Sequence, residues 1–200
     1  MRVLIVTAHP REDSYNHAVS EAVERGFRKA GHDVTTLDLY AIGFVPAMSA
    51  AEHAAYDSEQ PLIDPMTAAH GELVRQAEVL AFVYPTWWSG PPAMLRGWLE
   101  RVMEAGVAFT FDERGKVHPA LSNVRRIVGI TSYGSPWWVV KTLQDGGRRT
   151  LARALRMSCG LRTPTTWLGL YSVDTAGAEE RKAFLDRVEH RMGQLHGRSS

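Results

Sequence analysis

The chain alternates short apolar runs with longer amphipathic stretches, and this alternation restricts its fold more than any other feature. Runs of strand length lie at Val3–Ala8, Val34–Leu39, Val79–Tyr84 and Ile127–Ser132, and a weaker fifth lies at Thr165–Tyr171. Three of the first four are apolar almost throughout, which is typical of strands covered on both faces of a parallel sheet. The runs therefore predict a buried, mostly parallel sheet.

Helical patterns occupy the segments between these runs. An apolar stripe from Tyr15 to Ala30 ends at Gly31, a C-terminal stop signal. Asp64-Pro65 joins an N-cap residue to a proline suited to the first turn, so another helix is expected to begin there. Further helices are expected at Met94–Val102, between Trp138 and Met157, and at Glu179–Leu195. The alternation predicts an α/β fold with right-handed crossovers, in one domain over residues 1–200.

The composition argues against several classes of protein. Lys and Arg (23) nearly balance Asp and Glu (22), and no basic run occurs, so no broad nucleic-acid surface is expected. Cys159 is the single cysteine, and we expect it to be a small buried residue, not a nucleophile. No apolar run approaches the roughly 18 residues of a membrane span, and the N-terminus does not resemble a secretory signal. A cytoplasmic protein that is not integral to a membrane is expected.

Residues 40–66 form a long irregular segment. Its length exceeds that of a plain connection, so a functional or interface role is expected. Ser49 and Glu52 have the spacing of a capping box, which predicts a short helix within the segment. The C-terminal HGRSS is expected to be frayed.

Three loops follow strands at the places where open α/β sheets bind ligands. They read HPREDSYNHA after the first strand, PTWWSGPPA after the third and SYGSPWW after the fourth. Ligands in such sheets lie beyond the carboxyl ends of the strands. Because these ends share one edge of a parallel sheet, we expect the three loops to form one site.

The first loop leads into a helix N-terminus, where unpaired N–H groups and the positive end of the helix dipole favour a phosphate. Ser14 and Asn16 add side-chain donors, and His9 adds a ring N–H. The alternative is that Ser14 only caps the helix and His9 packs at the strand end. No GxxxxGK[ST] or GxGxxG motif is present. His9 and His17 have no third ligand at a recognisable spacing, so no metal site is expected.

The second and third loops combine aromatic side chains with glycine and proline. Gly90 and Gly134 permit a ligand to approach the backbone closely, and the neighbouring prolines hold the loops in fixed shapes. Trp87 and Trp88 suit a platform for a flat heterocycle. The alternative is that the tryptophans belong to the core or to a dimer interface, and this is the favoured interpretation for Trp98 in its helical pattern.

Four segments in order match known signatures. LIVTAHPREDSYNHAV fits an aliphatic strand followed by A-H and S-[FY]-N-x-A, and LYAIGFVPAMS fits D-L-Y-x-x-x-F-x-P. YPTWWSGPPAMLRGWLERV fits P-x-x-W-x-G-x-P-A-x-[LM]-[KR]-G-W-[FL]-[DE]-R-V, and residues 130–134 (ITSYG) are similar to T-T-G-G. Over most of its length the chain resembles the flavodoxin-like NAD(P)H:quinone oxidoreductase family.

This resemblance implies a flavodoxin-like three-layer sandwich with a five-stranded parallel sheet of order 2-1-3-4-5 and helices on both faces. It also implies a flavin at the carboxyl edge and a homodimer whose two active sites lie at the subunit interface. The residues that would hold the flavin phosphates are His9, Ser14, Tyr15, Asn16 and Ala18. The residues that would line the isoalloxazine are Pro85, Thr86, Trp87, Trp88, Thr131, Ser132, Tyr133 and Gly134.

The implied activity is reduction of a quinone by NAD(P)H through the flavin, in a ping-pong sequence of two-electron steps. The S-Y-N-x-A form favours FAD over FMN, whereas the short chain is typical of relatives that use FMN. Some relatives instead serve as ancillary subunits of potassium-efflux transporters, and that role is the alternative. A one-electron carrier is disfavoured, because the net charge of +1 gives no acidic surface.

The chain departs from the family pattern at three places. Trp87 stands where the best-studied relatives have Gln, and Ser89 stands where they have a bulky aromatic residue, so the electron acceptor is left open. Tyr133 replaces a glycine of T-T-G-G, which makes it the candidate for a catalytic role, with its side chain over the site. No Tyr or His lies between Tyr133 and Tyr171, so the Tyr and His of animal members have no counterpart; Lys141 is open as a substitute.

Overall fold

The computed structural model describes residues 1–56, 58 and 61–195, so the HGRSS tail lies outside the described residues. Its main sheet has five parallel strands in the order β2-β1-β3-β6-β7. The strands are β1 (Arg2–Thr7), β2 (Asp33–Asp38), β3 (Val79–Thr86), β6 (Arg126–Tyr133) and β7 (Thr165–Leu170). Counted among the sheet strands alone, this is the predicted order 2-1-3-4-5, so the flavodoxin-like prediction is confirmed.

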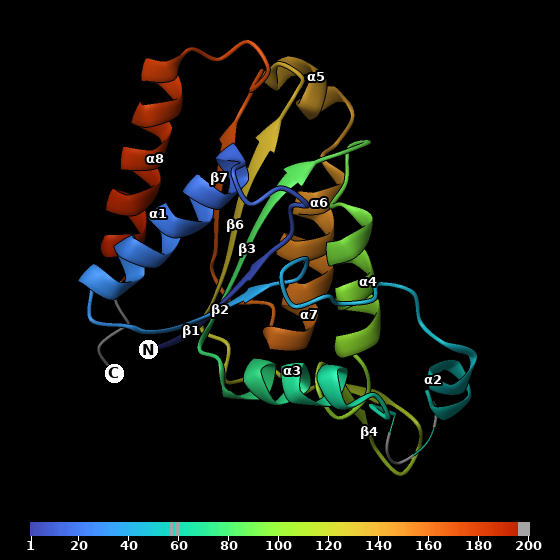
Figure 1. Ribbon diagram of the computed structural model, residues 1–200. Helices are drawn as coiled ribbons and strands as arrows, with labels where there is room; N and C mark the ends of the chain where they lie inside the picture. The colour runs from blue at the N-terminus through green and yellow to red at the C-terminus, as the bar shows by residue number, and fades with distance from the viewer. Residues whose placement is uncertain (57, 59–60, 196–200) are drawn as a thin grey trace.

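Helices cover both faces of the sheet (Figure 1). One face carries α1 (Tyr15–Lys29) and α8 (Ala178–Gly193), which pack against each other. The other face carries α3 (Pro65–Gln76), α4 (Ala93–Val102), α6 (Gly146–Arg149), the π-helical segment η1 (Thr150–Leu155) and α7 (Arg156–Cys159). The short helix α5 (Trp137–Thr142) lies at the carboxyl edge of the strands, and α2 (Ala50–Ala55) lies out to one side.

The helix starts follow the signals in the sequence. The Ser14 side chain accepts a hydrogen bond from the His17 N–H at the start of α1, and Asp64 does the same for Thr67 at the start of α3. Helix α1 ends next to Gly31, whose φ of 74° is readily adopted only by glycine. The predicted starts of α1 and α3 and the predicted end of α1 are therefore confirmed. Each of these signals depends only on residues that are neighbours in the sequence.

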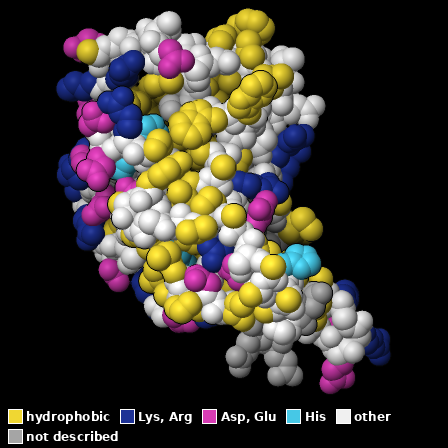
Figure 2. All heavy atoms as spheres, turned by 45° about the vertical axis from the view of Figure 1, so that its right-hand side comes forward, with side chains coloured by type: hydrophobic (Ala, Val, Ile, Leu, Met, Phe, Trp, Pro, Cys, Tyr) yellow, Lys and Arg dark blue, Asp and Glu magenta, His cyan; other side chains and the backbone are white. Residues whose placement is uncertain are grey.

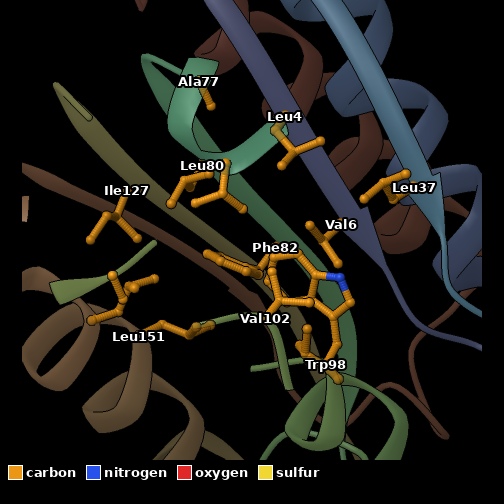
Figure 3. Packing of buried hydrophobic residues seen from close by; sticks show 14 of the residues in the cluster. Leu4, Val6, Leu37, Ala77, Leu80, Phe82, Trp98, Val102, Ile127 and Leu151 are labelled. Atoms are coloured by element: carbon orange, nitrogen blue, oxygen red, sulfur yellow. The ribbon is translucent and has the colours of Figure 1, made fainter. Parts of the chain in front are cut away.

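Each face of the sheet has its own core. On the α1/α8 face, side chains such as Ile5, Val23 and Phe184 pack together. On the other face, Phe82 and Trp98 lie at the centre of a larger cluster, with ring centroids 6.2 Å apart (Figure 3). Trp98 is fully buried and its indole N–H donates to His70 Nδ1 at 3.3 Å. The interpretation of Trp98 as a core residue is therefore confirmed.

The irregular segment after β2 is attached to α4 by a buried ion pair. Its predicted short helix is α2, and Ser49 and Glu52 form the expected capping box. Arg101 of α4 donates to the Glu52 carboxylate, with 2.7 Å between Nε and Oε1. Both side chains are less than a tenth exposed, so removal of either one would leave a buried charge without its partner.

Two parts of the chain differ from the prediction. The single helix expected between Trp138 and Met157 is interrupted at Gln144 and Asp145, which adopt positive φ angles of 62° and 30°. Helix α5 precedes this break, and α6, η1 and α7 follow it without a gap in the chain. A small antiparallel hairpin, β4 (Phe109–Phe111) and β5 (Val117–Pro119), was not predicted. Its strands are short and largely exposed, so they carry little hydrophobic pattern.

Candidate functional site

A cavity of about 420 Å³ opens at the carboxyl edge of the sheet. It lies between the loop after β3 and the loop after β6, with α5 beside it. Its lining residues are Thr86, Trp87, Trp88, Ser89, Tyr133, Gly134, Ser135, Val140, Leu143 and Asp145. The second and third loops singled out in the sequence therefore face one shared space.

Residues 87–90 form a tight turn on one side of this cavity. The Trp87 N–H donates to Gly90 O at 3.1 Å, and the Gly90 N–H donates to Trp87 O at 3.0 Å. The two central residues, Trp88 and Ser89, have φ angles of 49° and 58°, a conformation that favours glycine. Such strain often marks functional positions. The turn also holds the Trp88 side chain fully exposed to solvent, whereas Trp87 is about half exposed.

The other side of the cavity is fixed by hydrogen bonds between strand ends. Thr86 Oγ1 lies 2.8 Å from Thr131 Oγ1, which joins the ends of β3 and β6. Thr131 itself is buried, and Pro85 and Ser132 are paired in the same ladder. These contacts hold the ends of β3 and β6 in fixed positions on this side of the cavity.

Tyr133 borders the cavity but its side chain is buried. Its hydroxyl donates to Asp145 Oδ2 at 2.5 Å and accepts from the Trp167 indole N–H at 3.1 Å. Its ring stacks on Tyr171 with centroids 4.8 Å apart. Burial, followed by the hydrogen bond to Asp145, raises the pKa of Tyr133 well above its usual value. The side chain in place of the family's glycine thus packs toward β7 and α6, not over the cavity as expected.

The first loop lies near this cavity, with His9 beside Trp87 of its lining. The His9 ring lies 6.2 Å from the Trp87 ring and 6.3 Å from the His17 ring, measured between centroids. The Arg11 backbone N–H donates to His9 Nδ1 at 3.2 Å, which fixes the orientation of the imidazole. Desolvation by burial is the main cause that lowers the pKa of His9, so the neutral form is favoured.

The N-terminus of α1 directs its backbone donors toward this loop. Tyr15 and Asn16 are among its first residues, whose N–H groups have no partner within the helix. Their side chains bind elsewhere: the Tyr15 hydroxyl donates to Arg181 O at 2.9 Å, and the Asn16 amide donates to Thr7 Oγ1 at 3.2 Å. The Ala18 N–H is already bonded to Ser14 O. Any anion here would therefore contact backbone N–H groups of Tyr15 and Asn16, not their side chains.

A row of three polar side chains supports this helix start, and sequence reasoning missed two of them. Ser14 Oγ lies 3.0 Å from His17 Nδ1, and His17 Nε2 lies 2.6 Å from Asp38 Oδ2. Asp38 ends β2, which the strand order places beside β1. These contacts join the start of α1 to the end of β2 and hold the Ser14 side chain in position. The signal in the sequence was a carboxylate at the end of a predicted strand.

Several other features bear on the chemistry. Burial raises the pKa of the Cys159 thiol to about 12, and its Sγ–H donates to Leu155 O, so Cys159 is a packing residue as expected. Among the residues that the structure describes, no group of three or more His, Cys, Asp or Glu is arranged to hold a metal ion. Lys141 Nζ lies 4.8 Å from the centre of the Trp137 ring.

Comparison with known proteins places the chain in a known family. A family model described as a flavodoxin-like fold matches residues 1–194. The chain belongs to this family. The chain is 30% identical to the ribosyldihydronicotinamide dehydrogenase [quinone] of Rattus norvegicus, over 92% of the chain and 87% of that protein. Within this flavodoxin-like family, the resemblance to quinone oxidoreductases is confirmed.

Two further relatives show how far the similarity extends. NAD(P)H dehydrogenase [quinone] 1 of Rattus norvegicus is 34% identical over 67% of the chain and 54% of that protein, so the chain spans about half the length of the first such relatives. The NAD(P)H:quinone oxidoreductase from Methanothermobacter marburgensis has a TM-score of 0.81, with 26% identity over 100% of the chain and 99% of its own. In the described parts of this flavodoxin-like chain, no helix is long and apolar enough to cross a membrane.

Proposed function

We propose that this flavodoxin-like protein is an enzyme that reduces quinones with NAD(P)H by means of a bound flavin. The observation that carries the proposal is the joining of two features at one sheet edge: a cavity beside a strained tryptophan turn, and a helix N-terminus next to it. The first suits a flat heterocycle, and the second suits a phosphate. The names of the relatives support the same activity.

The residues present fit a flavin. A Cβ built on Gly90 has no neighbour closer than 4.0 Å, so no described atom blocks a close approach to the backbone at this position of the turn. The flavin phosphates would contact the N-terminus of α1 and Ser14, with His9 beside them. The residues proposed to line the ring are Pro85, Thr86, Trp87, Trp88, Thr131, Ser132, Tyr133 and Gly134. When bound, a flavin supplies hydride and electron transfer that no amino-acid side chain provides.

The protein's own groups would orient the reactants and limit the access of water. The Trp87–Gly90 turn forms one wall, and its backbone hydrogen bonds hold it rigid before any ligand arrives. Tyr133 is already bonded to Asp145, so it would act by holding the opposite wall in position, not by transferring a proton. The reductant and the quinone would use the same exposed face of the ring in turn, which is a ping-pong order.

We also propose that the protein acts as a homodimer. Large hydrophobic side chains are exposed on the irregular segment and at the site, among them Val45, Ile63, Trp88 and Trp138. Figure 2 shows hydrophobic side chains gathered over much of one face of the molecule. A second copy on this face would cover them and enclose the cavity. Light scattering of the purified protein tests the stoichiometry, and a monomer at micromolar concentration would contradict the dimer.

The cofactor and the activity are tested with the same preparation. The purified protein is expected to show flavin absorbance bands and to oxidise NAD(P)H when a quinone is added. Heat release and chromatography identify the cofactor, for which the S-Y-N-x-A form favours FAD over FMN. A colourless protein that neither FAD nor FMN reconstitutes would overturn the proposal. None of the relatives reported above is named as a transporter subunit, so the ancillary role is not proposed.

A further inference from the structure

A second and larger cavity, of about 750 Å³, adjoins the candidate flavin site. It is bordered by α5, α6, η1, the start of α7 and the strand β7 (Figure 1). Val140 and Asp145 line both cavities, so the two spaces lie directly side by side. The Gly146 N–H donates to Ser89 O at 2.7 Å, which attaches the start of α6 to the tryptophan turn.

The lining of this second cavity is strongly basic. The cationic residues that line it are Lys141, Arg148, Arg149, Arg153 and Arg156. Asp145 is the one acidic residue in the lining, and its carboxylate already accepts hydrogen bonds from the Tyr133 hydroxyl and the Arg148 backbone N–H. A chain with a net charge of only +1 therefore gathers five cations around one space. We name this space the basic cavity.

These cations have no acidic partners of their own. Within the described residues none of the five forms an ion pair, whereas arginines elsewhere, such as Arg25, Arg28 and Arg96, pair with glutamates. Arg149 donates only to the neutral amide of Gln144, and Arg156 Nε is buried without a hydrogen-bond partner in the described structure. Like charges this close repel each other. An anion in the cavity would remove that repulsion and supply the missing acceptors.

Aromatic groups at the rim add a second element of recognition. Trp137 lines the cavity, is about half exposed, and carries Lys141 over one face of its ring at 4.8 Å. Tyr171 lines the opposite part and is held by stacking on Tyr133. A flat base can pack on such side chains while its phosphates reach the arginines. The cavity therefore fits a nucleotide better than a simple inorganic anion.

We propose that the basic cavity binds the phosphates of the nicotinamide dinucleotide that reduces this enzyme, and that it makes NADPH a better substrate than NADH. This inference rests on the proposed function. Its geometric basis is that the two cavities adjoin at Val140 and Asp145, so a dinucleotide with its nicotinamide ring in the smaller one would extend its phosphates toward the larger. Two bridging phosphates carry two negative charges, and the additional phosphate of NADPH carries about 1.5 to 2 more at pH 7. Five cations beside one carboxylate match that larger charge.

The test compares three reductants that differ in phosphate content: NADPH, NADH and dihydronicotinamide riboside, which has none. Arg149→Gln and Arg153→Gln remove exposed cations that make no ion pair. Arg96→Gln, at an exposed arginine on α4, is the control for the loss of a surface cation outside the cavity. For the flavin-loaded double variant R149Q/R153Q, the KM for NADPH is expected to rise about tenfold or more and that for NADH to rise less, because charge-assisted hydrogen bonds are lost. The KM for the riboside is expected to stay unchanged.

An equal rise in KM for all three reductants would overturn the proposal, because the cations would then act on the fold or on the flavin. An unchanged KM for NADPH in R149Q/R153Q would also overturn it. An equal rise in the KM for NADPH in R96Q would do the same. If the double variant instead lost affinity for a single-stranded oligonucleotide while its NADPH kinetics were unaffected, the cavity would be a nucleic-acid site and the proposal would fail.

A binding measurement separates this inference from the proposed function. Inorganic pyrophosphate or NADP⁺ at millimolar concentration is expected to raise the melting temperature of the wild-type holoprotein and of R96Q, but not of R149Q/R153Q. If the melting temperature rises in this way but the protein shows no quinone turnover, the phosphate site is supported and the proposed function is contradicted. Quinone turnover with no phosphate-dependent stabilisation would support the enzyme and contradict the basic cavity.

Discussion

The hydroxyl of Tyr133 donates a 2.5 Å hydrogen bond to the carboxylate of Asp145, which joins the end of β6 to the start of α6. Asp145 in turn caps α6 through the Arg148 N–H at 3.0 Å, and it borders both cavities. The bond therefore fixes the wall that the candidate flavin site and the basic cavity share. Tyr133 occupies a position where the family pattern has glycine, so this connection is a feature of the present chain.

Tyr133→Phe is expected to lower the free energy of unfolding by about 1–3 kcal/mol, because the partly buried Asp145 carboxylate loses a donor and the Trp167 N–H loses its acceptor. Tyr171→Phe is the matched control, since Tyr171 has the same ring stack but no hydroxyl hydrogen bond in the described structure. Denaturant unfolding measures both variants. Equal stability of the two would show that the hydroxyl contributes nothing.

Gly90→Val tests whether the tryptophan turn contacts the flavin. The backbone at Gly90 does not need a positive φ, and an added Cβ meets no atom of the protein closer than 4.0 Å. The variant is therefore expected to fold normally yet lose its flavin absorbance, because the side chain would enter the space left for the ring. A bulky replacement of Pro91 is expected to have the same effect. A folded Gly90→Val protein, verified by circular dichroism, that retains the flavin bands would refute this placement.

His17→Phe tests the phosphate site at α1. The change removes both the contact to Ser14 Oγ and the contact to Asp38, so the Ser14 side chain loses the neighbour that orients it. The Kd of the apoprotein for FAD is expected to rise about tenfold, because the loss of one oriented hydrogen bond to a phosphate costs about that much. Its Kd for riboflavin, which has no phosphate, is expected to stay the same.

Fluorescence titration measures these affinities, and His53→Phe on the distant α2 is the control. If riboflavin binding weakened as much as FAD binding, His17 would act on the ring pocket or on the fold, and the assignment of the phosphates to α1 would be wrong.

The sheet was predictable from the sequence because burial on both faces makes its strands continuously apolar, as in Val79–Thr86. The helix caps at Ser14 and Asp64 were predictable because they depend on local spacing. The link from His17 to Asp38 was not, since it depends on β2 lying beside β1. The arginines of the basic cavity are visible as RRTLARALR, but their lack of acidic partners depends on long-range packing.

Glu104 is expected to make stability depend on pH. Its carboxyl is 2% exposed, and Oε2 is buried without a hydrogen-bond partner among the described residues. Burial and then the neighbouring Glu52 carboxylate raise its pKa to about 7, from an unfolded value near 4.5. Because the folded pKa is the higher one, the folded state binds the proton more tightly. The stabilisation from that proton is present below pH 4.5 and is lost as the pH rises through 7.

Glu104→Gln replaces the carboxyl by a neutral amide of the same shape, so its melting temperature is expected to fall less than that of the wild type between pH 5 and pH 8. Above pH 7 the variant is expected to be the more stable protein, since the cost of ionising a buried carboxyl is gone. Glu100→Gln, on the exposed side of α4, is the control and is expected to follow the wild type. If the melting temperatures of Glu104→Gln and the wild type changed by the same amount between pH 5 and pH 8, Glu104 would not be the group that titrates.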